Sequence, residues 1–319
     1  MPPFAITRRN LAGTGLALGA CPVRAQARAI RLIVPFPPGG AADILARLAA
    51  REMEPALSQP IIVENRPGAG ATLGSDLVAK SAPDGTTLLL SNIAAQGIAP
   101  AVFPAIPYDS LRDFTHIALI AAVPSGLVVS AASPYRALDQ LLDVARARPG
   151  SIRFGSNGNG TSSHAKLEIL RRVANVDITH VPYRGSQPAV VDILAGNIEG
   201  LIAAVPDVGR NERLRMLAVT TAERLPRWPD VPAMGELGYP ALVASNWFGI
   251  SGPAGMPAAT ADRLNAAMLA ALATPAMAER LADLGAAPNR MTRAEFTALV
   301  AADIARWAEI VRAANIRAD

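Results

Sequence analysis

The 319-residue chain has little cysteine, little lysine and few charged side chains. Its single Cys excludes an intramolecular disulfide framework and a cysteine-rich zinc site. Charged residues make up 18% of the chain, but the 51% hydrophobic share is ordinary, which disfavours intrinsic disorder. Lysine occurs only at Lys80 and Lys166, and the other basic residues are mostly dispersed arginines. Because no basic run or basic–aromatic stripe is present, the sequence predicts no nucleic-acid partner.

Histidine is also scarce, with 3 residues: His116, His164 and His180. They show no H-E-x-x-H or other metal-ligand spacing, so no metal site is predicted. His116 and His180 lie beside predicted strands and are interpreted as structural. A Ser–His–acid triad built on Ser163 and His164 stays open as an alternative, although G-x-S-x-G is absent and adjacent residues on a helix point apart.

The first residues have the parts of an export signal. Arg8 and Arg9 precede a short apolar stretch at 11–20, and Ala25-Gln26-Ala27 is a small-x-small cleavage site. The arginine pair favours the twin-arginine route, with cleavage after Ala27 and a periplasmic destination. The apolar stretch is too short for a membrane anchor. Lipid anchoring at Cys21, which follows Leu-Gly-Ala, is the alternative.

The mature chain is expected to be near neutral and not membrane-spanning. Removing residues 1–27 takes away three arginines and no acid, which lowers the formal net charge from +4 to +1. Two longer uncharged stretches, 86–108 and 117–135, are broken by proline and glycine. This spacing is typical of strands and turns rather than of a spanning helix.

The rest of the chain alternates between strand-like and helix-like segments. The strand-like runs are 30–34, 61–64, 86–91, 117–121, 127–130, 152–155, 178–181, 199–203, 214–219 and 247–251. The helix-like segments are 41–57, 73–81, 138–147, 162–174 and 188–195, followed by a helical C-terminal third at 258–273, 276–284 and 293–314. This alternation predicts an α/β fold with mostly parallel sheets.

Two glycine-rich loops lie between strands and helices in the first part of the chain. In the first, Gly39 and Gly40 allow backbone N–H groups to approach an anion at a helix N-terminus. Asp43 lies in the first turn of that helix, and complementing the helix dipole is the alternative to ligand binding. The second loop carries Gly68 and Gly70 in a G-x-G-x-x-x-G spacing, which misses the dinucleotide fingerprint by one residue. A tight turn alone stays an equal interpretation.

A third loop, 155–164, has the highest density of small polar residues. Its glycines, hydroxyls and following helix can converge on one anion. A nucleotide phosphate is disfavoured because no Walker lysine follows, so no cofactor is predicted. Thr161 or Ser162 acting only as an N-cap is the alternative. Tyr183, in the next strand-to-helix loop, offers either a hydroxyl over a pocket or a packing aromatic ring.

Together these segments resemble the Bug family, the periplasmic solute-binding proteins of tripartite tricarboxylate transporters. The matching stretches are 35–47, 59–90, 154–170, 180–200, 217–240, 247–257 and 305–316, which follow one another over nearly the whole mature chain. Each glycine loop alone is a weak signal, and their ordered combination carries the resemblance.

The resemblance implies a two-lobed, type II-like binding protein that captures a small carboxylate and performs no catalysis. One lobe would comprise 28–123 and 248–319, and the other 124–247. Delivery to one large and one small integral-membrane subunit is implied, and a monomer is expected. The residues that match ligand-binding positions are Gly39, Gly40, Ala41, Asp43, Gly68, Gly70, Asn92, Asn157, Gly158, Thr161, Ser162, Ser163, His164, Tyr183 and Asp207.

Departures from the family pattern concern the choice of ligand. Ala71 and Thr72 replace a common Gly and Asn, and Asn92-Ile93-Ala94 replaces a hydroxyl-rich stretch. The segment 207–215 is short and lacks a usual His, so the resemblance leaves the choice among carboxylates open. The acidic side chain of Asp207 would favour a ligand with an amino group. The alternative functions are a ligand sensor not coupled to transport and an exported α/β hydrolase.

Overall fold

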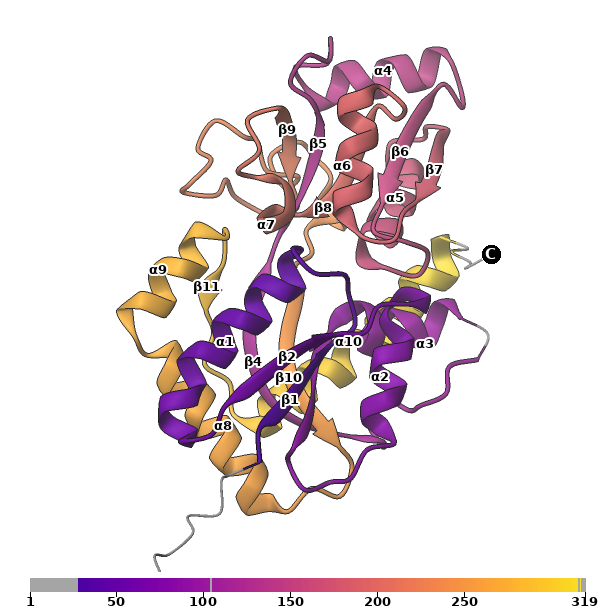
Figure 1. The fold of residues 1–319 in the computed structure, drawn as a ribbon. Coiled ribbons are helices and arrows are strands. Elements are labelled where there is room, and N and C mark those ends of the chain that lie inside the picture. Colours follow the sequence, from indigo (N-terminus) through magenta and orange to yellow (C-terminus); the bar gives the residue numbers. More distant parts are fainter. Residues whose placement is uncertain (1–27, 104, 315, 317–319) are drawn as a thin grey trace, which may run out of the picture.

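The computed structural model describes residues 28–103, 105–314 and 316. The predicted export signal, its cleavage site and Cys21 lie outside these residues. Within them the strands form two sheets, each covered by helices, and Figure 1 shows the sheets one above the other. The two-lobed α/β fold predicted from the sequence is therefore confirmed.

The first sheet is built mainly from the N-terminal part of the chain. Its strand order is β11-β4-β10-β3-β1-β2. β1 pairs in parallel with β2 and β3, whereas β10 runs antiparallel to β3 and β4, and β11 antiparallel to β4. The strands are β1 (Ile30–Val34), β2 (Ile61–Asn65), β3 (Thr87–Asn92), β4 (Phe114–Val123), β10 (Asn246–Pro253) and β11 (Ala287–Pro288).

The second sheet has the order β7-β6-β8-β5-β9. β6 pairs in parallel with β7 and β8, and β5 is antiparallel to β8 and β9. Its strands are β5 (Ser125–Ser130), β6 (Ile152–Ser156), β7 (Ile178–Pro182), β8 (Gly200–Ala204) and β9 (Leu214–Val219). Both sheets are thus mixed rather than mostly parallel, because β5 and β10, which adjoin the crossings between the sheets, run against their neighbours.

The helices cover both faces of each sheet. Around the first sheet lie α1 (Ala41–Leu57), α2 (Thr72–Ala79), α3 (Ala99–Val102), α8 (Ala258–Leu272), α9 (Pro275–Asp283) and α10 (Arg293–Ala314). Around the second lie α4 (Leu138–Ala147), α5 (Ser162–Val173), α6 (Ser186–Ala195) and the short α7 (Val205–Val208). None of the described helices combines the length and apolar character that crossing a membrane requires.

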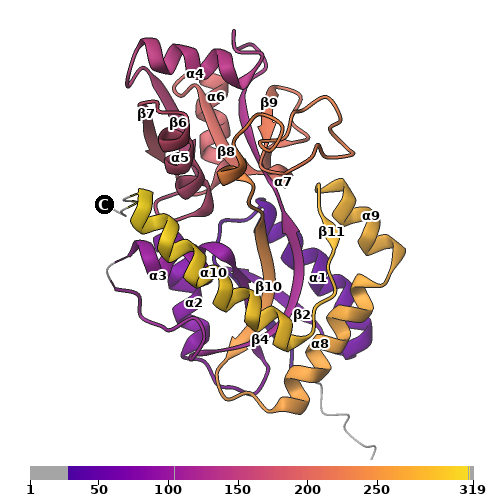
Figure 2. The ribbon, with the colours of Figure 1, turned by 180° about the vertical axis from the view of Figure 1, so that it is seen from behind.

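The hydrophobic core continues from one lobe into the other. α1 and α8 bury leucine, alanine and methionine side chains against β1, β3 and β4. A second cluster joins α10, through Phe296 and Trp307, to Leu127 and Phe154 of the upper sheet. Figure 2 shows α10 running across the front of the lower sheet in that view and ending beside α5. Burial of this apolar surface stabilises both lobes and their junction.

The chain crosses between the sheets at two adjacent points. β4 ends at Val123 and β5 begins at Ser125, so that Pro124 alone separates strands of different sheets. On the return, Asn246 of β10 pairs with Val123. Two neighbouring extended segments of this kind are a typical hinge between lobes.

Candidate functional site

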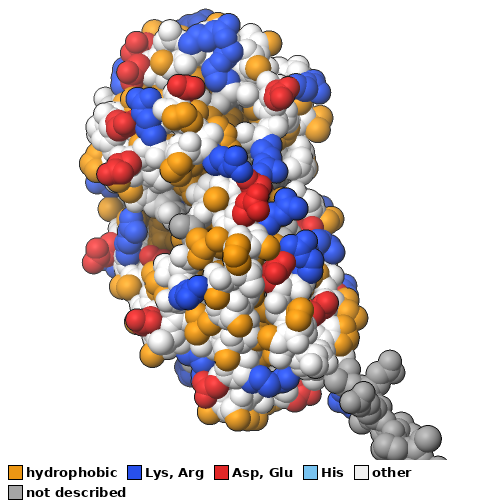
Figure 3. Space-filling view, turned by 90° about the vertical axis from the view of Figure 1, so that its left-hand side faces the viewer, with side chains coloured by type: hydrophobic (Ala, Val, Ile, Leu, Met, Phe, Trp, Pro, Cys, Tyr) orange, Lys and Arg blue, Asp and Glu red, His pale blue; other side chains and the backbone are white. Residues whose placement is uncertain are grey.

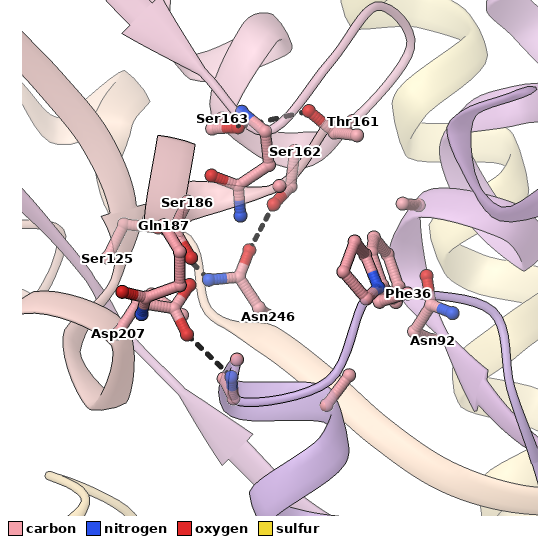
Figure 4. Close-up of a pocket in the computed structure, with 18 of the residues that line it drawn as sticks. Phe36, Asn92, Ser125, Thr161, Ser162, Ser163, Ser186, Gln187, Asp207 and Asn246 are labelled. Carbon is pink, nitrogen blue, oxygen red and sulfur yellow. Dashed lines mark hydrogen bonds between the residues drawn. The ribbon is translucent and has the colours of Figure 1, made fainter. Parts of the chain in front are cut away.

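A cavity of about 80 Å³ lies between the two lobes, at the end of β3 and at the starts of β5, β10, α1, α5 and α6. This volume is several times the roughly 10–15 Å³ that a single water needs. Figure 4 shows polar side chains from both lobes facing one another across it. Its lining residues are Phe36, Pro37, Pro38, Gly40, Ala41, Ala42, Asn92, Ile93, Ala94, Ser125, Asn157, Thr161, Ser162, Ser163, Arg184, Gly185, Ser186, Gln187, Pro188, Ala204, Asp207, Asn246 and Phe248.

The hydroxyls at the start of α5 are already engaged within the protein. Thr161 Oγ1 donates to the carbonyl of Gly158 at 2.7 Å and lies 3.0 Å from Ser163 Oγ, which accepts from the N–H of Asn157. Ser162 Oγ donates to Asn246 Oδ1. Thr161 has the backbone conformation of an N-cap, but its side chain does not cap the helix. No side chain caps α5, so the N–H groups of Ser162 and Ser163 at its start can face an anion.

At the start of α1, the protein supplies a carboxylate of its own. Asp207 Oδ1, from α7, accepts the N–H of Ala41 at 2.5 Å and so joins the two lobes (Figure 4). Burial raises the pKa of Asp207, while hydrogen bonds from Ala41, Ser186 and Asn157 act in the opposite direction. A helix N-terminus favours such an anion.

Two buried amides at the cavity wall have an atom without a partner. Asn92 Oδ1 accepts the N–H of Ala95 at 3.1 Å, but its Nδ2 has no hydrogen-bond partner among the described residues. Asn157 Oδ1 is likewise buried without a partner in the described structure, although its side chain also bonds Asp207. Since buried polar atoms normally have partners, these two mark positions where a ligand's acceptor and donor fit.

The structure brings eight of the predicted site residues to the cavity. These are Gly40, Ala41, Asn92, Asn157, Thr161, Ser162, Ser163 and Asp207. The other seven, Gly39, Asp43, Gly68, Gly70, Gly158, His164 and Tyr183, do not line it.

Asp43, although it does not line the cavity, shapes the α1 loop. It accepts hydrogen bonds from the N–H of Gly39, from Arg47 and from Asn65. Burial alone would raise the pKa of Asp43, but these hydrogen bonds and the charge of Arg47 outweigh burial, and the pKa is lowered. Its carboxylate thus shapes the loop that presents Gly40.

Three of the predicted glycines, which do not line the cavity, lie in closely packed loops. A side chain at Gly70 would meet the carbonyl of Asn159 at 2.9 Å across the lobes, and one at Gly158 would meet that of Tyr183 at 3.1 Å. Both adopt positive φ angles, as does Gly68. Their absent side chains therefore permit close backbone approach.

The histidines and Tyr183 are held by neighbours outside the cavity. His164 stacks on His180 with ring centroids 4.3 Å apart, and its Nδ1 lies 3.2 Å from the N–H of Gly160. Burial lowers the pKa of both His116 and His180 to about 4, which fits the structural interpretation. Tyr183 donates to Asp192 at 2.6 Å, and desolvation together with this bond raises its pKa to about 12.

Sequence reasoning missed several cavity residues. Ser125 and Asn246 are the first residues of β5 and β10, and no local pattern marks either of them as a site residue. Ser186 and Gln187 begin α6, next to the tyrosine loop, and a systematic search of helix starts would have found them. Among the described residues no group of histidine, cysteine, aspartate and glutamate side chains is arranged to hold a metal ion.

Comparisons with known proteins give the family. Residues 45–316 match the tripartite tricarboxylate transporter family receptor. BugT of Bordetella pertussis is 40% identical over 301 residues, which cover 92% of each chain. The structure of the periplasmic binding protein BugD superposes with a TM-score of 0.86 at 30% identity, covering 91% of this chain and 99% of that one.

Two further solved structures contain acids. A protein of R. palustris with adipate has a TM-score of 0.87 and 32% identity, and covers 91% of this chain and 98% of its own. MatC of Rhodopseudomonas palustris with bound malate has a TM-score of 0.84 and 34% identity. The match covers 91% of this chain and 100% of MatC. The family and these neighbours are binding proteins rather than enzymes, and this chain belongs to the receptors of the tripartite tricarboxylate transporter family.

Proposed function

We propose that this receptor captures a small carboxylate in the cavity between its lobes and delivers it to one large and one small membrane subunit of a transporter. The observation that carries the proposal is the set of donors at the cavity wall, which are the N–H groups of Ser162 and Ser163 at the uncapped start of α5 and the buried, unpartnered Nδ2 of Asn92. Adipate and malate in related structures support the same ligand class. Because these donors belong to both lobes, a bound acid favours the closed arrangement.

The cavity also favours a second polar group on the acid. The unpartnered Oδ1 of Asn157 requires a donor, which a hydroxyl or amino group of the ligand provides. Asp207, which already accepts from three groups, acts in this proposal mainly as a contact between the lobes. The ligand is therefore a hydroxy or amino acid of small size.

In this proposal the export signal is cleaved after Ala27, and the mature receptor is a monomer in the periplasm. The lobes would comprise 28–123 with 248–319, and 124–247. The change of sheet at Pro124 and the pairing of Asn246 with Val123 support these limits. The face of the molecule in Figure 3 shows charges of both signs scattered rather than one large single-sign patch.

The test is ligand-dependent stabilisation of the purified protein by malate, adipate and citrate, with their neutral amides as controls. An acid at 100 times its Kd stabilises the folded state by about 2.7 kcal/mol. Asn92→Asp keeps the acceptor for Ala95 but replaces the free donor with an acid, so it should abolish binding. Its melting temperature without ligand is measured as well, because burying the acid costs stability. Equal stabilisation by acids and amides would contradict a carboxylate site.

A further inference from the structure

Lys166 is a buried cation behind the cavity. It lies on α5, is 0% exposed, and its Nζ donates to Ser125 Oγ at 2.8 Å and to Asn246 Oδ1 at 3.2 Å. Lysine is almost never fully buried unless it is paired with an acid. In the described part of the chain no carboxylate pairs with it, and the charge that acts on Nζ is another cation, Arg306.

The ammonium orders the hydrogen bonds of the cavity wall. Because lysine only donates, Asn246 must turn Oδ1 toward it, which leaves Nδ2 to donate to Ser125 Oγ at 3.0 Å. Ser125 Oγ thus accepts two hydrogen bonds, and its hydroxyl proton remains free to be donated to a third group. Since Ser125 and Asn246 line the cavity (Figure 4), this proton is available to a ligand there.

The buried charge lacks compensation until an anion is bound. Desolvation, and secondarily Arg306, lowers the pKa of Lys166 to about 7. A carboxylate in the cavity would be separated from Nζ by a single layer formed by Ser125 and Asn246. In a medium of low effective dielectric, opposite charges at that separation attract strongly.

We propose that Lys166 is a positioning residue that supplies the counter-charge for the ligand's carboxylate, acting through the Ser125 hydroxyl and the Asn246 amide. This inference rests on the proposed function, and it assigns the anionic end of the ligand to the side of the cavity formed by β5 and β10. Binding of the anion favours protonated Lys166, so the receptor takes up a proton when it binds near or above neutral pH.

Other titratable groups occupy the elements around Lys166. They are Arg306 and Asp303 of α10, His180 of β7, and His164 and Glu168 on α5 itself. Asp303 accepts from Trp247 Nε1 at 2.6 Å, and the His180 ring stacks on His164. A pH profile must therefore be compared with one from a variant that lacks only the ammonium.

The experiment compares Lys166→Met with Lys80→Met. Both remove one positive charge, but Lys80 is exposed and pairs with Asp76 on the surface. Affinities are measured calorimetrically for malate, adipate, citrate, phosphate and sulfate, and for the neutral amides of malate and adipate. We expect Lys166→Met to lose roughly 10- to 100-fold in affinity for the acid that binds, the range for hydrogen bonds to charged groups. Lys80→Met should bind normally.

A second measurement distinguishes a counter-charge from simple packing. Without ligand, Lys166→Met should melt no lower than the wild type, since it removes an uncompensated buried charge. Between pH 7 and pH 9 the affinity of the wild type should fall by up to about tenfold per pH unit, because an ever larger share of Lys166 must gain a proton. The affinity of Lys166→Met should not change over this pH range. If that variant does not fold, Lys166→Arg serves instead, because its guanidinium stays charged and its affinity should not fall between pH 7 and pH 9.

The outcomes separate this inference from the proposed function. Equal affinity of the wild type and Lys166→Met for the acid, or a flat wild-type profile, overturns the role of Lys166 and leaves the carboxylate receptor intact. If the wild type binds only phosphate or sulfate, and Lys166→Met does not bind them, the proposed ligand class is wrong. The role of Lys166 as a counter-charge is then supported. If none of these anions binds the wild type, both proposals are wrong.

Discussion

At the residue scale, the buried polar side chains define the site, and the sequence indicates only some of them. Gly40, Thr161 and Ser162 were predictable because a glycine or hydroxyl at the start of a helix has a local chemical meaning. Lys166 has no such signal, since a lysine within an amphipathic helix normally lies on its solvated face. Its burial results from the packing of α5 against β5, β10 and α10, which local sequence does not encode.

His116 gives a residue-scale prediction on pH. Its Nδ1 lies 2.9 Å from Ser251 Oγ and its Nε2 lies 3.0 Å from the carbonyl of Ser110. Burial lowers its pKa from 6.5 to about 4, so between these values the unfolded chain binds a proton that the folded protein does not. Stability is therefore lost as the pH falls from 6.5 to 4, by about 3 kcal/mol from this residue.

Urea unfolding of the wild type and His116→Gln at pH 7 and pH 4 checks this prediction. The quantity compared is the change in unfolding free energy between the two pH values, which should be smaller in the variant. His180, whose pKa burial also lowers to about 4, contributes to both proteins. An unchanged pH dependence in His116→Gln would show that this residue titrates normally.

At the element scale, the alternation of strands and helices was predictable, whereas the direction of strand pairing was not. Hydrophobic runs followed by glycine loops predict β1–α1, β2–α2 and β6–α5 directly. The antiparallel placement of β5 and β10 depends on how the chain crosses between the sheets. No local pattern marks that crossing, so mostly parallel sheets were predicted where mixed sheets form.

The close packing of β6 against β8 allows an element-scale prediction. A methyl group at Gly200 would collide with the ring of Phe154 and approach the carbonyl of Val128 to 2.8 Å. Gly200→Ala should therefore destabilise the protein by about 1–3 kcal/mol, as overpacking does in other cores. Gly97→Ala, whose nearest contacts would be an ordinary 3.5 Å, is the matched control.

Urea unfolding of these two variants measures the effect. The double variant Gly200→Ala with Phe154→Leu should recover the part of the loss that comes from the ring, and not the part that comes from the backbone carbonyl. If Gly200→Ala and Gly97→Ala are equally stable, the residues between β6 and β8 can shift to accommodate the added methyl group, and the prediction is wrong.

At the scale of the whole molecule, ion pairs join the lobes outside the cavity. Asp283, at the end of α9, pairs with Arg210 at 3.0 Å and also with Arg227, both from the part of the chain that follows β8. The guanidinium groups are more than half exposed, so each pair contributes at most about 1 kcal/mol. Together they favour the arrangement of the lobes in this structure, which the proposed function takes as closed, and they are weakened by salt.

Asp283→Asn should therefore weaken binding of the acid by about 2- to 5-fold, because the ligand must offset a less favourable closure. Small-angle scattering of the ligand-free variant should give a larger radius of gyration than the wild type. Asp143→Asn, which removes a surface pair with Arg146 inside α4, is the control and should change neither quantity. If Asp283→Asn still differs from the wild type in affinity or radius of gyration at high salt, the cause is not electrostatic.

The contact between Asp207 and Ala41 joins the lobes without the participation of any ligand atom. In the proposed function, this contact favours closure even without ligand, and a receptor closed without ligand would compete with loaded ones for the membrane subunits. The unfavourable desolvation of the Asp207 carboxylate opposes that state. In the proposed function, the Asp207 carboxylate thus influences how often a receptor without ligand binds the transporter.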